Sequence, residues 1–230
     1  MMLLPGFGEL YVAVRARLFM AFMFSLVLSP ILHLPPPPDS VIGLVTLLLA
    51  EIAVGVFIGG LSRMIISAVN IAGMIIAYES SLASALTVDM TQNQGAQDTS
   101  LGNFLSVTAV VLMFSMNLHH MMLRGLADSY TLFLPGQFPL VEDFANHAAH
   151  TMSGIFLMGV QMASPHIVIG LILYLGAGII SRLIPNIQIF FVLMAPQLLL
   201  SFFVLMVAFS SIMMWYMDYF KNTLATFLAP

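Results

Sequence analysis

Two acidic side chains stand inside apolar segments, and they are the first candidates for chemistry in this sequence. Glu51 lies within a run of leucine, alanine and isoleucine, and Glu79 lies near the end of the next apolar stretch. A charged side chain at the centre of a membrane helix costs about 2.5–3.5 kcal/mol on insertion scales, so it is kept for a reason. One reason is structural: the carboxylate can pair with an arginine or a backbone amide of a neighbouring subunit. The other is a site that handles cations or protons, and Glu79, beside a polar stretch, favours the structural interpretation.

Histidines offer a second possible chemistry. Asp143, His147 and His150 are spaced i, i+4 and i+7, which places them on one face if the segment is helical. Three such groups could bind a divalent metal ion, or they could form a solvated polar face. His119 and His120 are adjacent and point about 100° apart on a helix, so interfacial hydrogen bonding suits them better than a shared ion.

Enzyme signatures are absent from the sequence. It lacks the His-Glu-x-x-His and Gly-x-Ser-x-Gly motifs, a glycine-rich phosphate loop with lysine, and any cysteine. Ser153 would need a histidine partner on another helix to act as a nucleophile. We therefore predict no catalytic site, no metal site and no cofactor.

A polar stretch at residues 89–100 separates two long apolar regions. It is rich in amides and contains glycine, and no lysine or arginine occurs between Met64 and Met122. Polar backbone of this kind beside membrane-length helices requires water or protein to satisfy it. The stretch is either an exposed connection or a loop that lines or plugs a polar passage. For the second interpretation the candidate residues are Asp89, Met90, Thr91, Gln92, Asn93, Gln94, Gly95, Gln97 and Asp98.

The composition identifies the elements that must position these residues. Of 230 residues, 60% are hydrophobic and 7% are charged, which is typical of a membrane protein and excludes an ordinary soluble domain. The net charge of −4 and the scattered basic residues do not suggest nucleic acid. No strand-like alternation occurs, so we predict an all-α protein. The expected helical segments are residues 11–32, 41–62, 64–86, 101–122, 151–181 and 183–217.

Prolines and glycines refine this expectation. Pro30 should end the first segment, and Pro165, Pro185 and Pro196 should break the last two segments into tilted hairpins. Residues 127–150 should hold short helical pieces. The spacing of Gly55, Gly59 and Gly60 predicts a face on which another helix packs closely. If the segments alternate across a membrane, the side with most basic residues is cytoplasmic, and that side holds Arg15, Arg17, Arg63, Arg124 and Lys221, against Arg182 alone on the other.

The order of several short motifs resembles the FliR family of flagellar type III secretion proteins, called SctT in injectisomes. The resemblance covers nearly the whole chain, although no single motif is specific. The motifs are Leu4-Pro5-Gly6-Phe7-Gly8-Glu9, Arg15-Ala16-Arg17-Leu18, Glu51-xxx-Gly55-xxx-Gly59, the stretch 89–102, Asn117-Leu118-His119-His120, Ser129-Tyr130, Ala163-Ser164-Pro165 and Arg182-Leu183-Ile184-Pro185.

The resemblance implies a non-enzymatic subunit of the export gate in the bacterial inner membrane, at the flagellar basal body. Its fold would look like a FliP-like piece fused to a FliQ-like piece, in one domain over residues 1–230. Partners would be FliP-like, FliQ-like, FlhB-like and FlhA-like proteins, and unfolded flagellar proteins would pass through the pore. The polar stretch would supply its plug loop, and Glu51, Gly55, Gly59, Gly60, Glu79, Arg182 and Pro185 would lie at helix-packing interfaces.

Two departures from the family pattern stand out. The family has a complete helix before the Pro5-Gly6 turn, so a first helix is expected to be missing before Met1. Asp89-Met90 replaces the Asp-Pro that is frequent in the family's plug. The alternative function is an ion-coupled secondary transporter that uses Glu51 and Glu79.

Overall fold

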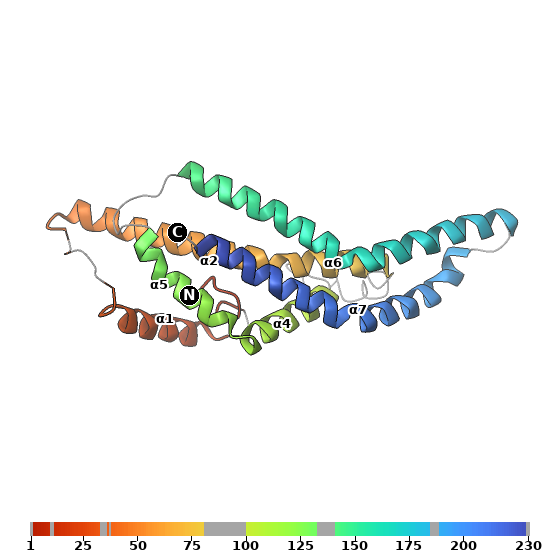
Figure 1. Cartoon of the computed structure of the whole chain (residues 1–230), viewed down its shortest axis with the longest axis horizontal. Coiled ribbons are helices and arrows are strands. Elements are labelled where there is room, and N and C mark those ends of the chain that lie inside the picture. The colour runs from red at the N-terminus through yellow and green to blue at the C-terminus, as the bar shows by residue number, and fades with distance from the viewer. Residues whose placement is uncertain are drawn as a thin grey trace. The chain divides into compact units, whose positions relative to one another are not determined.

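The computed structural model of the chain is built from α-helices (Figure 1). It describes residues 2–9, 12–32, 36, 38–80, 100–132, 141–184 and 189–228. These ranges contain helix and no strand, which confirms the predicted all-α class. The helices are α1 (Val14–Leu28), α2 (Val41–Glu79), α4 (Ser100–Ser115), α5 (Leu118–Leu132), α6 (Val141–Leu183) and α7 (Ile189–Leu228).

Within these described ranges, three helices are long and apolar enough to cross a membrane, namely α2, α6 and α7, and α4 with α5 makes a fourth candidate as one bent span. In the most apolar stretch of α2 only 11% of the residues are buried inside the chain. So many apolar side chains on the outside of a helix favour contact with lipid or with neighbouring subunits over contact with water. The membrane class predicted from composition is therefore confirmed.

Helix α2 corrects the expected topology. The sequence predicted separate spans over residues 41–62 and 64–86, with Arg63 between them, but the structure has one continuous helix of 39 residues. Neither Ser62 nor Arg63 interrupts the backbone, and the Ser62 hydroxyl donates to the carbonyl of Ile58 within the helix at 2.9 Å. At about 1.5 Å per residue the helix is longer than the ~30 Å of hydrocarbon in a bilayer. The membrane orientation inferred from the basic residues assumed that short spans alternate across the membrane, and that assumption is wrong.

The break between α4 and α5 was not predicted from the sequence. Residues 101–122 were expected to form one segment, but the chain bends by 77° between two helices at Met116 and Asn117. Asn117 has φ of 59°, a left-handed backbone that asparagine tolerates better than most residues. No proline stands there, so the usual sequence signal was missing.

The prolines act differently from one another. Helix α1 ends at Leu28, two residues before Pro30, as predicted. Pro165 and Pro196 lie inside α6 and α7, which continue past them instead of ending. Pro185 lies outside the described residues. The short pieces expected over residues 127–150 are the end of α5 and the first ten residues of α6, which then runs on for 43 residues in total.

Contacts divide the chain into two compact units. The first contains Met1–Ile66, Val110–Gly154 and Tyr219–Pro230, and the second contains Ser67–Ala109 and Ile155–Asp218. Helices α2, α4, α6 and α7 each contribute residues to both units. That the whole chain acts as one domain stays a prediction.

Small residues bring the helices of the second unit close together. Ala68, Val69 and Ala72 of α2 are completely buried. A Cβ atom added at Gly159 of α6 would lie only 2.8 Å from the Ile71 side chain, so the glycine lets α6 approach α2. This close approach forms the core around which the polar groups of the next section are arranged.

Candidate functional site

The predicted plug residues 89–98 lie outside the described residues, but the helices on either side of them are described. The chain leaves α2 after Ser80 and enters α4 at Ser100. Both ends belong to the second unit, and polar side chains cluster at the end of α2. We therefore take this polar cluster, formed by Glu79, Ser80, His166, Tyr174, Gln197 and Ser201, as the candidate functional site.

Ser80 caps two of the carbonyl groups in the last turn of α2. Its hydroxyl donates to the carbonyls of Ile76 at 2.6 Å and Ala77 at 3.2 Å, and its backbone N–H donates to Ile76 at 2.9 Å. The last four carbonyls of a helix have no partner within the helix, so such caps are needed wherever the end is buried. Ser80 is only 1% exposed, so protein surrounds this capping residue.

A side chain from α7 caps the final carbonyl. The Nε2 group of Gln197 donates to the backbone carbonyl of Glu79, 118 residues away in sequence, and also to the hydroxyl oxygen of Tyr174 in α6 at 3.3 Å. Gln197 is buried. One amide group thus joins α2, α6 and α7.

The side chain of Glu79 lies on the other side of the same turn. A Cβ atom at Gly170 would overlap its Oε2 atom, so the carboxylate lies directly over the backbone of α6. A small cavity of about 10 Å³ is lined by Glu79, Gly170, His166 and Gln197, among others. Such a volume is near the minimum that holds one water molecule, and the polar lining gives that water partners.

His166 connects α6 to α7 beside this cavity. Its Nε2 atom lies 3.3 Å from the carbonyl oxygen of Ser201, so Nε2–H is the donor and the other ring nitrogen, Nδ1, is left as an acceptor. Nδ1 is buried and has no hydrogen-bond partner within the described residues. The cluster therefore combines a carboxylate, an imidazole, an amide and a phenol, all in a largely apolar unit.

Helices α2 and α4 meet near the ends that flank residues 81–99. The backbone of Gly73 lies against the backbone of Gly102, and the hydroxyl of Ser106 donates to the side-chain oxygen of Asn70. These contacts hold the two helices together within about three turns of the points where the chain leaves α2 and enters α4.

Glu51 has a partner in the first unit. The phenolic hydroxyl of Tyr130 in α5 donates a hydrogen bond to its carboxylate. Glu51 is half-buried, while its neighbour Ile52 is exposed. The carboxylate therefore faces α5 and not only the exterior.

The predicted glycine face is divided between occupied and open positions. A Cβ atom at Gly59 would lie 2.7 Å from the Leu3 side chain, whereas Gly55 and Gly60 have nothing within 4 Å of an added Cβ. Arg182 is exposed in the last turn of α6. Glu51 belongs to the first unit, whereas Glu79 and Arg182 belong to the second, and the packing role of these residues stays a prediction.

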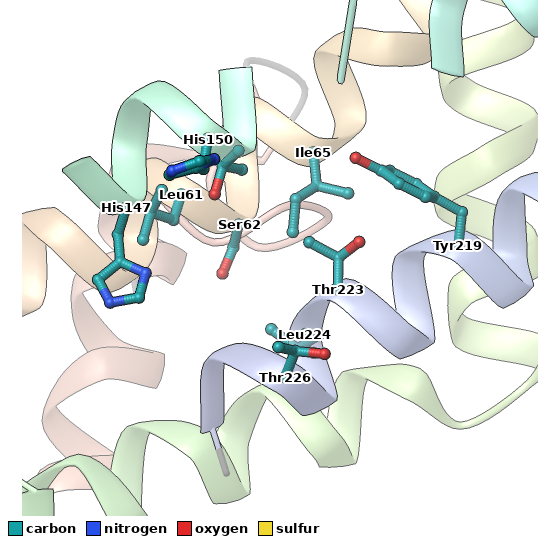
Figure 2. A pocket seen from close by; sticks show the side chains of 10 residues that line it. Leu61, Ser62, Ile65, His147, His150, Tyr219, Thr223, Leu224 and Thr226 are labelled. Carbon is teal, nitrogen blue, oxygen red and sulfur yellow. The ribbon is translucent and has the colours of Figure 1, made fainter. Parts of the chain in front are cut away.

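A larger groove lies within the first unit, between α2, α6 and α7 (Figure 2). Its volume is about 310 Å³, and His147 and His150 of α6 both line it, together with Ser62, Tyr219 and Thr223. His147 and His150, which were predicted to share a helix face, therefore do so, whereas the side chain of Asp143, the third residue of that prediction, lies outside the described part of the structure. No group of three metal-ligating side chains occurs among the residues that the structure describes. The two imidazoles and the hydroxyl groups can exchange hydrogen bonds with a ligand or a partner chain.

The partners of Glu79 were not predicted from the sequence. His166, Gly170 and Tyr174 recur every four residues in α6, and Gln197 and Ser201 do so in α7. Such spacing places each set on one face of its helix. Polar residues that recur on one face of an otherwise apolar helix were the available signal, because a buried polar group needs a partner.

Comparisons with known proteins agree with the fold. Residues 1–223 match the model of the bacterial export proteins, family 1. The flagellar biosynthetic protein FliR of Caulobacter vibrioides is 30% identical over 228 residues, which cover 98% of this chain and 90% of that protein. The FliR protein of Bacillus subtilis is 29% identical, with 97% of this chain and 86% of that protein covered. The FliR protein of Escherichia coli is 27% identical, with 81% of this chain and 70% of that protein covered.

The family match and these relatives make the chain a component of the flagellar export apparatus, and its apolar helices agree with a membrane location. The resemblance predicted from short motifs is thereby confirmed over nearly the whole length. The chain belongs to family 1 of the bacterial export proteins, together with the FliR proteins of flagellar biosynthesis.

Proposed function

We propose that the chain is a structural, channel-forming subunit of the flagellar type III export gate, in the inner membrane at the basal body. Residues 89–98 close the pore at rest and yield when an unfolded flagellar protein arrives. The observation that carries the proposal is the family match over residues 1–223, which include this polar stretch between two apolar helices.

The chemistry of the segment suits a reversible closure. Amide side chains and glycine stay wettable when the pore opens, and Met90 provides a flexible apolar contact when it closes. No lysine or arginine occurs between Met64 and Met122, so this part of the chain offers no strong ionic contact to an acidic cargo. A pore for many unfolded sequences benefits from such weak binding, because tight contacts would slow passage.

The proposed partners are FliP-like, FliQ-like, FlhB-like and FlhA-like proteins. Their docking is supported by large exposed apolar side chains on the long helices, for example Ile52 and Val56 beside the open Gly55 and Gly60 positions of α2. Lipid alone would also cover such a surface. Glycine positions without any neighbour favour a helix partner, because close backbone approach is what they permit.

Cross-linking tests the closure role directly. The chain has no cysteine, so Gln94→Cys introduces a single thiol. In assembled gates with a stalled export substrate that carries cysteines, we expect a disulfide between position 94 and the substrate. Tyr78→Cys, on an exposed position of α2 before the segment, is the matched control. Cross-linking at the control position alone would contradict the proposal, and copurification with FliP-like and FliQ-like chains checks assembly in both variants.

The relatives favour protein export over the ion-coupled transporter. They are named as flagellar biosynthetic proteins. The interaction of Tyr130 with Glu51 supports a structural carboxylate over one that handles ions. We therefore keep export as the single proposed function.

A further inference from the structure

We propose that Gln197 is a positioning residue that holds the last turn of α2 and thereby keeps the gate closed. The amide group of this α7 side chain fixes the point from which the chain enters the proposed closure segment. The consequence for closure rests on the proposed function, whereas the hold on α2 is independent of it.

The hydrogen bonds of Gln197 make it a specific clasp. Its amide nitrogen carries two N–H donors, and the structure directs them to the Glu79 carbonyl and the Tyr174 hydroxyl. The carbonyl is the last one of α2, which the helix itself cannot satisfy. Ser80 caps Ile76 and Ala77, and Gln197 adds the cap on Glu79.

The burial of Gln197 and its neighbours makes the loss of its hydrogen bonds costly. Gln197 is buried at 7% exposure, and Ser80, the next residue after the carbonyl that it caps, is buried at 1%. The Glu79 carbonyl is part-buried, so the loss of its donor leaves it poorly satisfied and is expected to loosen the helix end. An amide in a 40-residue helix dominated by apolar side chains is itself costly unless both of its donors are used.

The carboxylate of Glu79 provides a second contact from the same turn. It lies over the backbone of Gly170, so the backbone carbonyl is held by α7 and the side chain by α6. Tyr174 stands four residues after Gly170 and supports Gln197 from the same helix. The end of α2 is thus held from both helices of the second unit that contain internal prolines, Pro165 and Pro196.

Thiol labelling measures the hold on α2. Ser80→Cys places a buried thiol at the helix end in a chain without other cysteines. We expect Gln197→Leu, which keeps a branched side chain of similar bulk and removes the donors, to raise the maleimide labelling rate at position 80 by up to about tenfold, as the loss of one hydrogen bond allows. Tyr174→Phe should have a smaller effect in the same direction.

Two controls separate the clasp from general loosening. Gln161→Leu changes an exposed glutamine of α6 and should leave labelling at position 80 unchanged. Tyr78→Cys, at an exposed position, should label equally with and without Gln197→Leu. All variants are measured as assembled gates in membrane vesicles at matched protein levels.

Ion leak through the same vesicles completes the test, with deletion of residues 92–97 as the reference for an open gate. Faster labelling together with a raised leak in Gln197→Leu supports the proposal. Unchanged labelling at position 80 overturns it, and so does faster labelling without leak where the deletion leaks. If the deletion itself does not leak, the closure function fails, and labelling alone then decides whether Gln197 holds α2.

Discussion

The backbone of Gly73 in α2 lies directly against the backbone of Gly102 in α4. A Cβ atom at Gly73 would overlap the Cα atom of Gly102 and lie 2.8 Å from its nitrogen. These two helices lead into and out of the proposed closure segment, so their close contact sets the distance between its two ends. Neither partner atom belongs to a flexible side chain, and the contact therefore cannot adapt by a rotamer change.

Gly73→Ala should destabilise the chain for this reason. Overpacking against backbone costs about 1–3 kcal/mol, whereas alanine recovers about 1 kcal/mol of helix propensity relative to glycine. We expect a net loss of stability, seen as a lower midpoint of thermal unfolding in detergent. Gly176→Ala in α6, where an added Cβ meets nothing within 4 Å, should leave the midpoint unchanged or raise it. Equal midpoints for both variants would refute the tight contact.

The pair Glu51 and Tyr130 distinguishes a structural from an ion-handling carboxylate. Tyr130→Phe removes the donor and should cost about 1.5–3 kcal/mol of unfolding free energy, the range for a hydrogen bond to a charged group. Glu51→Gln retains an acceptor for the same hydroxyl and should support nearly normal swimming motility at matched protein levels. A loss of motility in Glu51→Gln with unchanged thermal stability would instead assign the charge a direct role.

The carboxylate of Glu79 should respond to a methyl group at Gly170. Gly170→Ala fills the space that Oε2 occupies, so the side chain must move and the last turn of α2 is disturbed. We expect slower assembly into the gate, measured as reduced copurification with FliP-like chains. Gly178→Ala, on the same helix with no neighbour within 4 Å, is the matched control. Restoration of copurification in the double variant Gly170→Ala with Glu79→Ala would confirm the steric cause.

An added Cβ atom at Gly55 or Gly60 meets no neighbouring atom among the described residues. Substitutions at these two positions can therefore distinguish an effect on folding from an effect on assembly with other subunits. Gly55→Ala and Gly60→Ala should leave the thermal midpoint of the isolated chain unchanged, since nothing lies within 4 Å of either added methyl group. If a partner helix packs there, both variants should copurify less well with neighbouring subunits. Undiminished copurification would show that lipid, and not protein, covers this face.

The class of fold could be predicted from the sequence because composition decides it. Long segments without charged residues indicate membrane helices, because a helix satisfies its own backbone polar groups in lipid. Pro30 also predicted the end of α1. Helix boundaries were harder. Arg63 was read as the end of a span, although a single arginine does not interrupt a helix, and α2 continues through it. The chain bends at Asn117 without a proline. The positive φ of this residue causes the bend, and the residue type alone does not predict it.

The candidate site could be predicted only in part. Glu79 stood out because a carboxylate in an apolar run is costly, but its partners Gln197 and Gly170 are more than ninety residues away in the sequence. Only packing brings α6 and α7 to the end of α2, and local patterns do not encode that register. His147 and His150 were placed on one face correctly because three-residue spacing is a local property of a helix.

The central claim is that residues 89–98 obstruct the export pore at rest, and ion conductance tests it most directly. Membrane vesicles that contain assembled gates with residues 92–97 deleted should conduct small ions, whereas the intact gate should not. Assembly is verified in the same samples by copurification of FliP-like and FliQ-like chains. Conductance equal to that of the intact gate, in a variant shown to be assembled, would contradict the account.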